Sequence, residues 1–152
     1  MIASALVGTP AQAASGSISD PRGDAYPDVL KLAFVNGDAA VKMTMTHVDV
    51  DAAESEWFFI HWGTVGKRYA VLESRSAGQR ELLYYSGASA VPVPKACAGL
   101  KVIHRDAYDR TKVVIPRSCI SKAPNGLRFS GKATAGIRSF DETKKSPRIA
   151  RG

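Results

Sequence analysis

Three aspartates stand four residues apart near the start of the chain, in the segment SDPRGDAYPDV (residues 19–29). Carboxylates and loop carbonyls are the hard oxygen ligands that calcium prefers, so Asp20, Asp24 and Asp28 form a candidate calcium site. Their spacing differs from that of an EF-hand loop, in which most ligands fall at every second position and the last is a glutamate. Turn formation by the Asp-Pro and Gly-Asp pairs, with Asp28 capping the entry into a strand, is the alternative that the same residues allow.

Aromatic residues gather in the segment EWFFIHWGTV (residues 56–65). Alternation along a strand places Trp57 with Phe59 on one face and Phe58 with Trp62 on the other, so both faces carry large rings. One interpretation is a central strand that is buried on both sides. The other is an exposed Trp62 that stacks on a sugar ring, with Tyr84 or Tyr85 beside it as further ligand-binding residues.

The histidines do not form a recognisable catalytic arrangement. His47, His61 and His104 all fall inside predicted strands, where a packed imidazole with one hydrogen-bond partner is the favoured interpretation. The chain has no G-x-S-x-G, H-E-x-x-H or phosphate-binding glycine motif, and the pair Glu54 and Glu56 fits any acidic loop. We therefore predict no catalytic residues and do not favour an enzyme.

Positive charge is concentrated in the second half of the chain. Residues 77–152 contain 15 Lys and Arg against 5 Asp and Glu, whereas residues 1–76 contain 6 against 9. This asymmetry favours an anionic partner, and for an exported protein we expect a cell-wall polymer or an acidic glycan. A solvated, solubilising face is the alternative. Nucleic acid is not favoured, because the basic residues lie apart from the aromatic residues that would stack on bases.

The beginning of the chain resembles the end of a secretory signal. Residues 1–17 carry no charge and contain Ala11-Gln12-Ala13, a small-x-small pattern that signal peptidase accepts. A basic n-region is missing, and the apolar part is shorter than usual. We interpret residues 1–16 as the remnant of a secretory signal or as a disordered leader, and expect a secreted protein. No later apolar run approaches the roughly 20 residues that a membrane span needs.

Two cysteines, Cys97 and Cys119, are the only ones in the chain. They flank the predicted strands GLKVIH (99–104) and TKVVIP (111–116), and a hairpin centred near Tyr108 would place them opposite each other. This symmetry predicts a disulfide, which also fits an oxidising compartment. Two buried free thiols are the alternative, and a zinc site is not predicted because no further ligands stand at the required spacing.

Period-two hydrophobic patterns dominate the sequence and predict about eight strands. They are expected at residues 29–35, 40–48, 56–65, 67–74, 80–87, 99–104, 111–116 and 127–137. Asn36-Gly37 predicts a hairpin between the first two, and the Pro-rich stretch 91–99 predicts a crossover between sheet regions. We therefore expect an all-β, two-sheet antiparallel β-sandwich, jelly-roll or immunoglobulin-like, over residues 17–140, followed by a charged tail (141–152) in which Ile149 docks on the body.

The order D-P-R-G-D…Y-P-D-V-L-K-L-A-F, then A-V-K-M-T-M, the cysteine hairpin and a closing S-P-R-I-A-R-G resembles a group of small, uncharacterised secreted proteins of high-GC bacteria. The start also resembles the first strand of carbohydrate-binding and DOMON-type β-sandwich modules. That second resemblance implies that the aspartates contribute to a calcium site. Neither resemblance implies a catalytic residue.

These observations lead to one expected function and two alternatives. We expect an exported, non-catalytic binding or cell-envelope-associated module that contacts an anionic or carbohydrate polymer. A secreted enzyme inhibitor or small hydrolase, acting through the hairpin tip at residues 107–110, is the first alternative. A structural accessory of a secreted assembly is the second.

Overall fold

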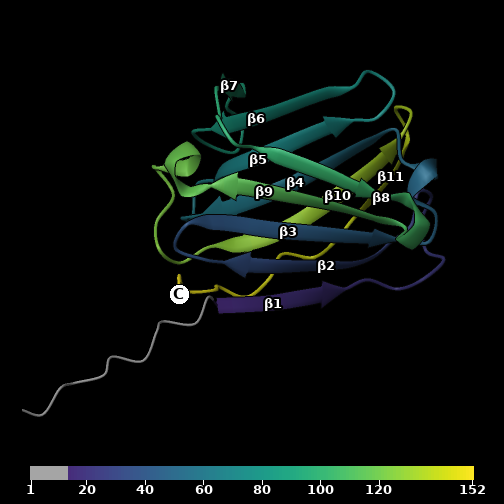
Figure 1. Cartoon of the computed structure of the whole chain (residues 1–152), viewed down its shortest axis with the longest axis horizontal. Helices are drawn as coiled ribbons and strands as arrows, with labels where there is room; N and C mark the ends of the chain where they lie inside the picture. Colours follow the sequence, from purple (N-terminus) through teal and green to yellow (C-terminus); the bar gives the residue numbers. More distant parts are fainter. Residues whose placement is uncertain (1–13) are drawn as a thin grey trace, which may run out of the picture.

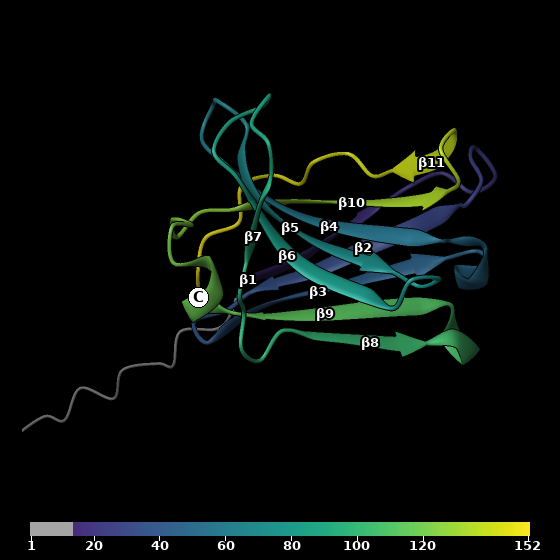
Figure 2. The same ribbon diagram turned by 90° about the horizontal axis from the view of Figure 1, so that it is seen from above.

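Two antiparallel sheets pack face to face (Figures 1 and 2). The structure is a computed structural model and describes residues 14–152. The expected all-β sandwich is confirmed. The expectation of a signal remnant falls mostly on residues 1–13, which lie outside the described residues.

One sheet has five strands in the order β1-β2-β3-β9-β8. Their bounds are β1 Ala14–Ser19, β2 Val29–Asn36, β3 Ala40–His47, β8 Lys101–Arg105 and β9 Arg110–Pro116. The Asn36-Gly37 hairpin is confirmed, because β2 and β3 pair directly with Phe34 opposite Met43.

The other sheet has six strands in the order β11-β10-β4-β5-β6-β7. Their bounds are β4 Ser55–Trp62, β5 Lys67–Ser74, β6 Gln79–Tyr85, β7 Val93–Lys95, β10 Arg128–Ala135 and β11 Ser139–Glu142. Three short 3-10 helices complete the described part: η1 Val50–Ala52, η2 Asp106–Tyr108 and η3 Arg117–Ile120. None of the helices in residues 14–152 has the length and apolarity to cross a bilayer.

Three strands were not expected from the sequence. β1 consists mostly of Ala, Ser and Gly, which carry almost no hydrophobic periodicity, yet it pairs with β2 along six residues. β7 contains Pro94 and lies at the edge of its sheet, where a residue without an amide hydrogen is tolerated. β11 falls within the charged C-terminal stretch. Strand pairing thus reaches beyond residues 17–140 at both ends.

The core fills the space between the sheets with the inward side chains of alternating positions. Phe34 of β2 stacks on Phe129 of β10 with ring centroids 4.6 Å apart. Beside them the two sheets approach closely, since a Cβ at Gly131 would lie only 2.5 Å from Met45 Cε. A glycine at this position of β10 therefore sets how tightly the layers pack.

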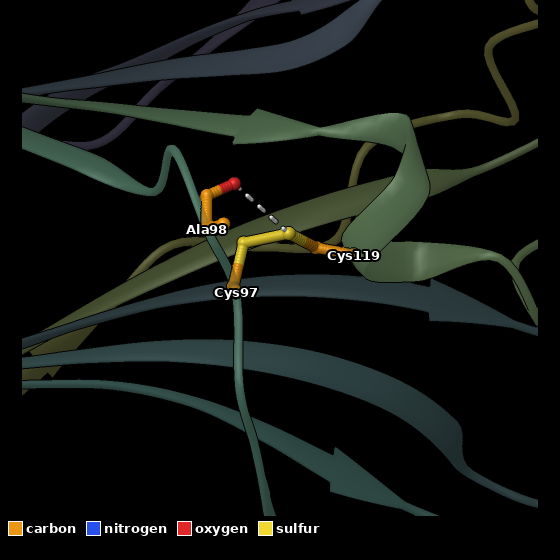
Figure 3. Close-up of a disulfide and its surroundings, with 3 residues drawn as sticks. All are labelled: Cys97, Ala98 and Cys119. Carbon is orange, nitrogen blue, oxygen red and sulfur yellow. Dashed lines mark hydrogen bonds between the residues drawn. A yellow bond between two sulfur atoms is a disulfide. The ribbon is translucent and has the colours of Figure 1, made fainter.

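A disulfide joins Cys97, which follows β7, to Cys119 in η3 (Figure 3). The Cα atoms are 5.2 Å apart, a normal separation for a disulfide. The sequence prediction is confirmed, because β8 and β9 form the expected hairpin with Arg105 opposite Arg110. Continuing that register past both strands places Cys97 opposite Ser118, the neighbour of Cys119 in η3.

The C-terminal segment runs beside β10 instead of leaving the body. The amide of Ser146 donates to the carbonyl of Phe129 at 2.8 Å, and Ile149 exchanges two backbone hydrogen bonds with Leu127. The expected docking of Ile149 is confirmed, since its side chain packs against the core. Residues 143–149 therefore extend the sheet along the part of β10 that β11 does not cover.

Candidate functional site

A cleft of about 560 Å³ lies beside the turn between β4 and β5. Figure 2 shows this turn at the same end of the molecule as the C-terminus. Four of its lining residues are cationic: Lys67, Arg128, Lys145 and Arg148. The remaining lining residues include Trp62 and His61, and none is acidic. We call this site the basic cleft.

Strand pairing brings the walls of the basic cleft together. Lys67 at the start of β5 lies opposite Trp62 at the end of β4, and Arg128 at the start of β10 lies opposite His61. The turn between β4 and β5 packs tightly, because a Cβ at Gly66 would lie 2.8 Å from the backbone of Ala88. The C-terminal segment beside β10 adds the last two cations, Lys145 and Arg148.

The charge of the basic cleft is not neutralised from within. In residues 14–152, none of its four cationic side chains forms a salt bridge. His61 hydrogen-bonds Ser130 Oγ at 2.8 Å. Burial, and then the charges of Lys145 and Arg68, lower the pKa of His61 to about 4. At neutral pH the histidine is therefore uncharged, and the lysines and arginines alone make the cleft positive.

The three aromatic residues proposed as ligand contacts separate into two places. Trp62 stacks on Tyr84 with centroids 6.2 Å apart, and the ammonium of Lys122 lies 4.6 Å from the centre of the Tyr84 ring. Tyr85 is buried in a separate cluster with Ala70, where Arg68 covers its ring. Of the three, Trp62 lines the basic cleft, and Tyr84 packs against Trp62.

A group of carboxylates lies at the opposite end of the sandwich, where the β1–β2 loop approaches β11 (Figure 1). One carboxylate oxygen from each of Asp20, Asp24 and Asp141 lies within 4.8 Å of the other two. Asp28 also contributes to the turn, because its Oδ2 accepts from the amide of Gly23 at 2.6 Å. Of the three expected aspartates, Asp20 and Asp24 thus lie in one carboxylate group with Asp141, whereas Asp28 holds the turn beside them.

Asp141 was not expected from the sequence. It lies in β11, far along the chain from the other aspartates, and its Oδ2 accepts a hydrogen bond from the amide of Val29 at 2.8 Å. Burial, followed by the charges of nearby aspartates, raises the pKa of Asp20. Burial and the charges of Asp24 and Asp28 likewise raise the pKa of Asp141. We call Asp20, Asp24, Asp28 and Asp141 the aspartate cluster.

The other two histidines belong to a buried polar network between the sheets. His47 is almost fully buried, as expected, and hydrogen-bonds Glu56 at 2.8 Å. Glu56 also accepts from the hydroxyl of Thr111 at 2.7 Å. His104 contacts Glu73 at 2.9 Å. Glu56 is therefore held by the fold and does not pair with the exposed Glu54 to flank a substrate.

The hairpin tip considered for an inhibitor or a hydrolase is also structural in part. Asp109 Oδ1 accepts from the amide of Val50, and its backbone carbonyl accepts from the amide of His47. Asp109 adopts a left-handed conformation with φ of 49°. Its side chain therefore fastens the tip to η1.

No family model matches the chain, and no curated protein is significantly similar to it in sequence.

Proposed function

We propose that the protein is an exported, non-catalytic binding module whose basic cleft takes an anionic polymer, either an acidic glycan or an anionic cell-wall polymer. The observation that carries the proposal is the convergence of Lys67, Arg128, Lys145 and Arg148 on one cleft without an acidic residue among its walls. Cationic clefts attract polyanions over long distances, and their charged hydrogen bonds to anionic groups are among the strong ones.

Trp62 supports a sugar-containing ligand. Its indole lines the cleft and is held by stacking on Tyr84 and by a tilted contact with Tyr69, so it presents a rigid aromatic surface at little entropic cost. A phosphate or uronate group beside the sugar would reach the cations of the C-terminal segment. The disulfide supports a location outside the cytoplasm, since disulfides persist in oxidising compartments.

The experiment measures binding of the purified protein to polygalacturonate, to teichoic acid and to neutral dextran by calorimetry. We expect binding to one or both polyanions, weakening as salt increases because the charges become screened. The double variant Arg128→Gln with Lys145→Gln should lower the affinity about tenfold, which corresponds to about 1.4 kcal/mol.

A matched control removes the same amount of charge elsewhere. Arg105→Gln with Arg110→Gln alters two exposed arginines at the β8–β9 hairpin, away from the cleft. The control should leave the affinity almost unchanged. The proposal fails if neither polyanion binds, if dextran binds equally well, or if both double variants weaken binding to the same extent.

A further inference from the structure

The aspartate cluster gathers four carboxylates with little positive charge to offset them. Asp20, Asp24 and Asp141 bring one oxygen each within 4.8 Å of the others. Lys144 is the one cation whose charge lowers the pKa of Asp20, and the neighbouring aspartates act in the opposite direction. Such a grouping is unfavourable in a fold unless something else occupies the space between the oxygens.

Asp28 provides a second and independent indication of a ligand. Its side chain is only 8% exposed, and its Oδ1 atom is buried with no hydrogen-bond partner in residues 14–152. An ionised carboxylate oxygen that is removed from water without a partner is costly. Asp28 stands close enough to the cluster for its charge to act on both Asp20 and Asp141. A cation at the cluster would give this oxygen the partner it lacks.

We propose that Asp20, Asp24, Asp28 and Asp141 form a calcium site that ties the β1–β2 loop to β11. Calcium binds oxygen at about 2.3–2.6 Å, so two ligands of one ion lie at most about 5 Å apart, and the oxygens of Asp20, Asp24 and Asp141 fall within this limit. Magnesium requires a stricter octahedron at about 2.0–2.1 Å, whereas calcium accepts the flexible geometry of carboxylates that come from a loop and a strand.

The site would join the two layers of the sandwich. β1 is an edge strand of the five-stranded sheet, and β11 is an edge strand of the six-stranded sheet. The hydrogen bond from the amide of Val29, the first residue of β2, to Asp141 already connects the two sheets at this point. A bound ion would add a second connection, between the β1–β2 loop and β11. This inference is independent of the basic cleft, which lies at the other end of the molecule.

Thermal unfolding of the full chain tests the proposal, first in a chelator and then with calcium chloride. At about 100-fold excess over Kd, a single site raises the Tm of a domain of this size by about 5–10 °C. Calorimetry should give one calcium ion per chain. Asp24→Asn is the principal variant, because Asp24 is exposed and should not impair folding, and it should lose most of the shift.

Glu142→Gln is the matched control. It removes one charge from the residue next to Asp141, on an exposed side of β11, and should keep the full calcium shift. The proposal is overturned if calcium produces no heat and no shift, if Asp24→Asn keeps the shift, or if Glu142→Gln loses it equally. An equal shift with magnesium would overturn the assignment to calcium. Binding of polyanions to the Asp24→Asn variant should remain unchanged, so the two proposals can fail separately.

Discussion

Glu56 and Glu73 are 0% and 2% exposed, and Asp28 and Asp141 are 8% and 6% exposed, so the four acids are similarly buried. Both pairs lie at the same end of the sandwich, where Val29, the neighbour of Asp28, stands opposite His47. The surroundings differ. Glu56 contacts His47 and the Arg75 guanidinium, and Glu73 contacts His104 and Arg80. In residues 14–152, Asp28 and Asp141 form no salt bridge and accept hydrogen bonds from the backbone amides of Gly23 and Val29.

This difference shows two ways in which one small domain buries carboxylate side chains. In the Glu56 and Glu73 network, the fold supplies the cationic and hydrogen-bonding partners from its own strands, and Arg75 connects the network to the loops through Asp51 and Asp106. In the aspartate cluster, Asp28 Oδ1 has no hydrogen-bond partner in residues 14–152, and under our proposal a calcium ion supplies it. The difference lies in charge: Glu56 and Glu73 have cationic partners within the fold, whereas the carboxylates of the aspartate cluster repel one another.

The largest effect should come from breaking the network of Glu56 and Glu73. Glu56→Gln leaves His47 and Arg75 buried without their acid, and we expect the free energy of unfolding to fall by about 3 kcal/mol. Urea denaturation at pH 7 measures the change. Glu54→Gln is the control, because Glu54 is exposed, and it should change stability by less than about 0.5 kcal/mol. Equal effects of both substitutions would remove the distinction between the two groups of acids.

The aspartate cluster should make the stability of the calcium-free protein depend on pH. The folded-state pKa values of Asp20 and Asp141 are raised above 3.8, so above that pH the folded state holds more protons than the unfolded state. Stability from these groups is therefore complete below their unfolded pKa and is lost as pH rises through the folded values. His61 acts oppositely, since its pKa of about 4 makes stability fall as pH decreases from about 6.5.

The two contributions can be separated by repeating the titration of stability with saturating calcium. With calcium bound, stability should no longer decrease as pH rises through the folded-state pKa values of the aspartates. Only the decrease in stability that His61 causes at low pH should remain. Identical profiles with and without calcium would contradict the comparison.

A smaller effect is expected from removing one charge of the cluster. Asp20→Asn should raise the stability of the calcium-free protein at pH 7 by about 0.5 kcal/mol, because it relieves repulsion. In the network of Glu56 and Glu73, the corresponding change, Glu73→Gln, should lower the free energy of unfolding. Chemical denaturation in the presence of a chelator measures the change in the free energy of unfolding for both variants. The comparison requires that the two changes have opposite signs.

The smallest effect concerns the cation beside the cluster. Lys144 lowers the pKa of Asp20, so Lys144→Gln should increase calcium affinity severalfold at low ionic strength. The gain should disappear in high salt, where the charge is screened. Calorimetry at two salt concentrations measures it, and a gain that does not depend on salt would point to a structural change instead.

The sequence was informative where side chains alternate. Strands such as β3, with Val41, Met43 and Met45 facing the core, follow directly from the period of two. β1 could not be foreseen, because Ala, Ser and Gly carry little pattern and the strand forms by pairing with β2. Tyr85 could have been separated from Tyr84, since neighbouring residues of a strand point to opposite faces.

The candidate sites were only partly predictable for a physical reason. Asp20, Asp24 and Asp28 are close in sequence and were recognised, whereas Asp141 reaches them through the tertiary pairing of β11 with β10. The basic character of the second half was evident. That Lys145 and Arg148 face the β4–β5 turn depends on the path of the C-terminal segment, which sequence spacing does not encode.

The C-terminal segment has a further consequence for how the molecule behaves at high concentration. The strand β10 would be open along its outer side from Leu127 to Gly131 if residues 143–149 did not hydrogen-bond to it. An open strand edge is a template for pairing with another chain. These residues therefore protect the edge of β10. A chain cut after Glu142 would expose unpaired backbone groups along this edge and should aggregate more readily than the intact protein.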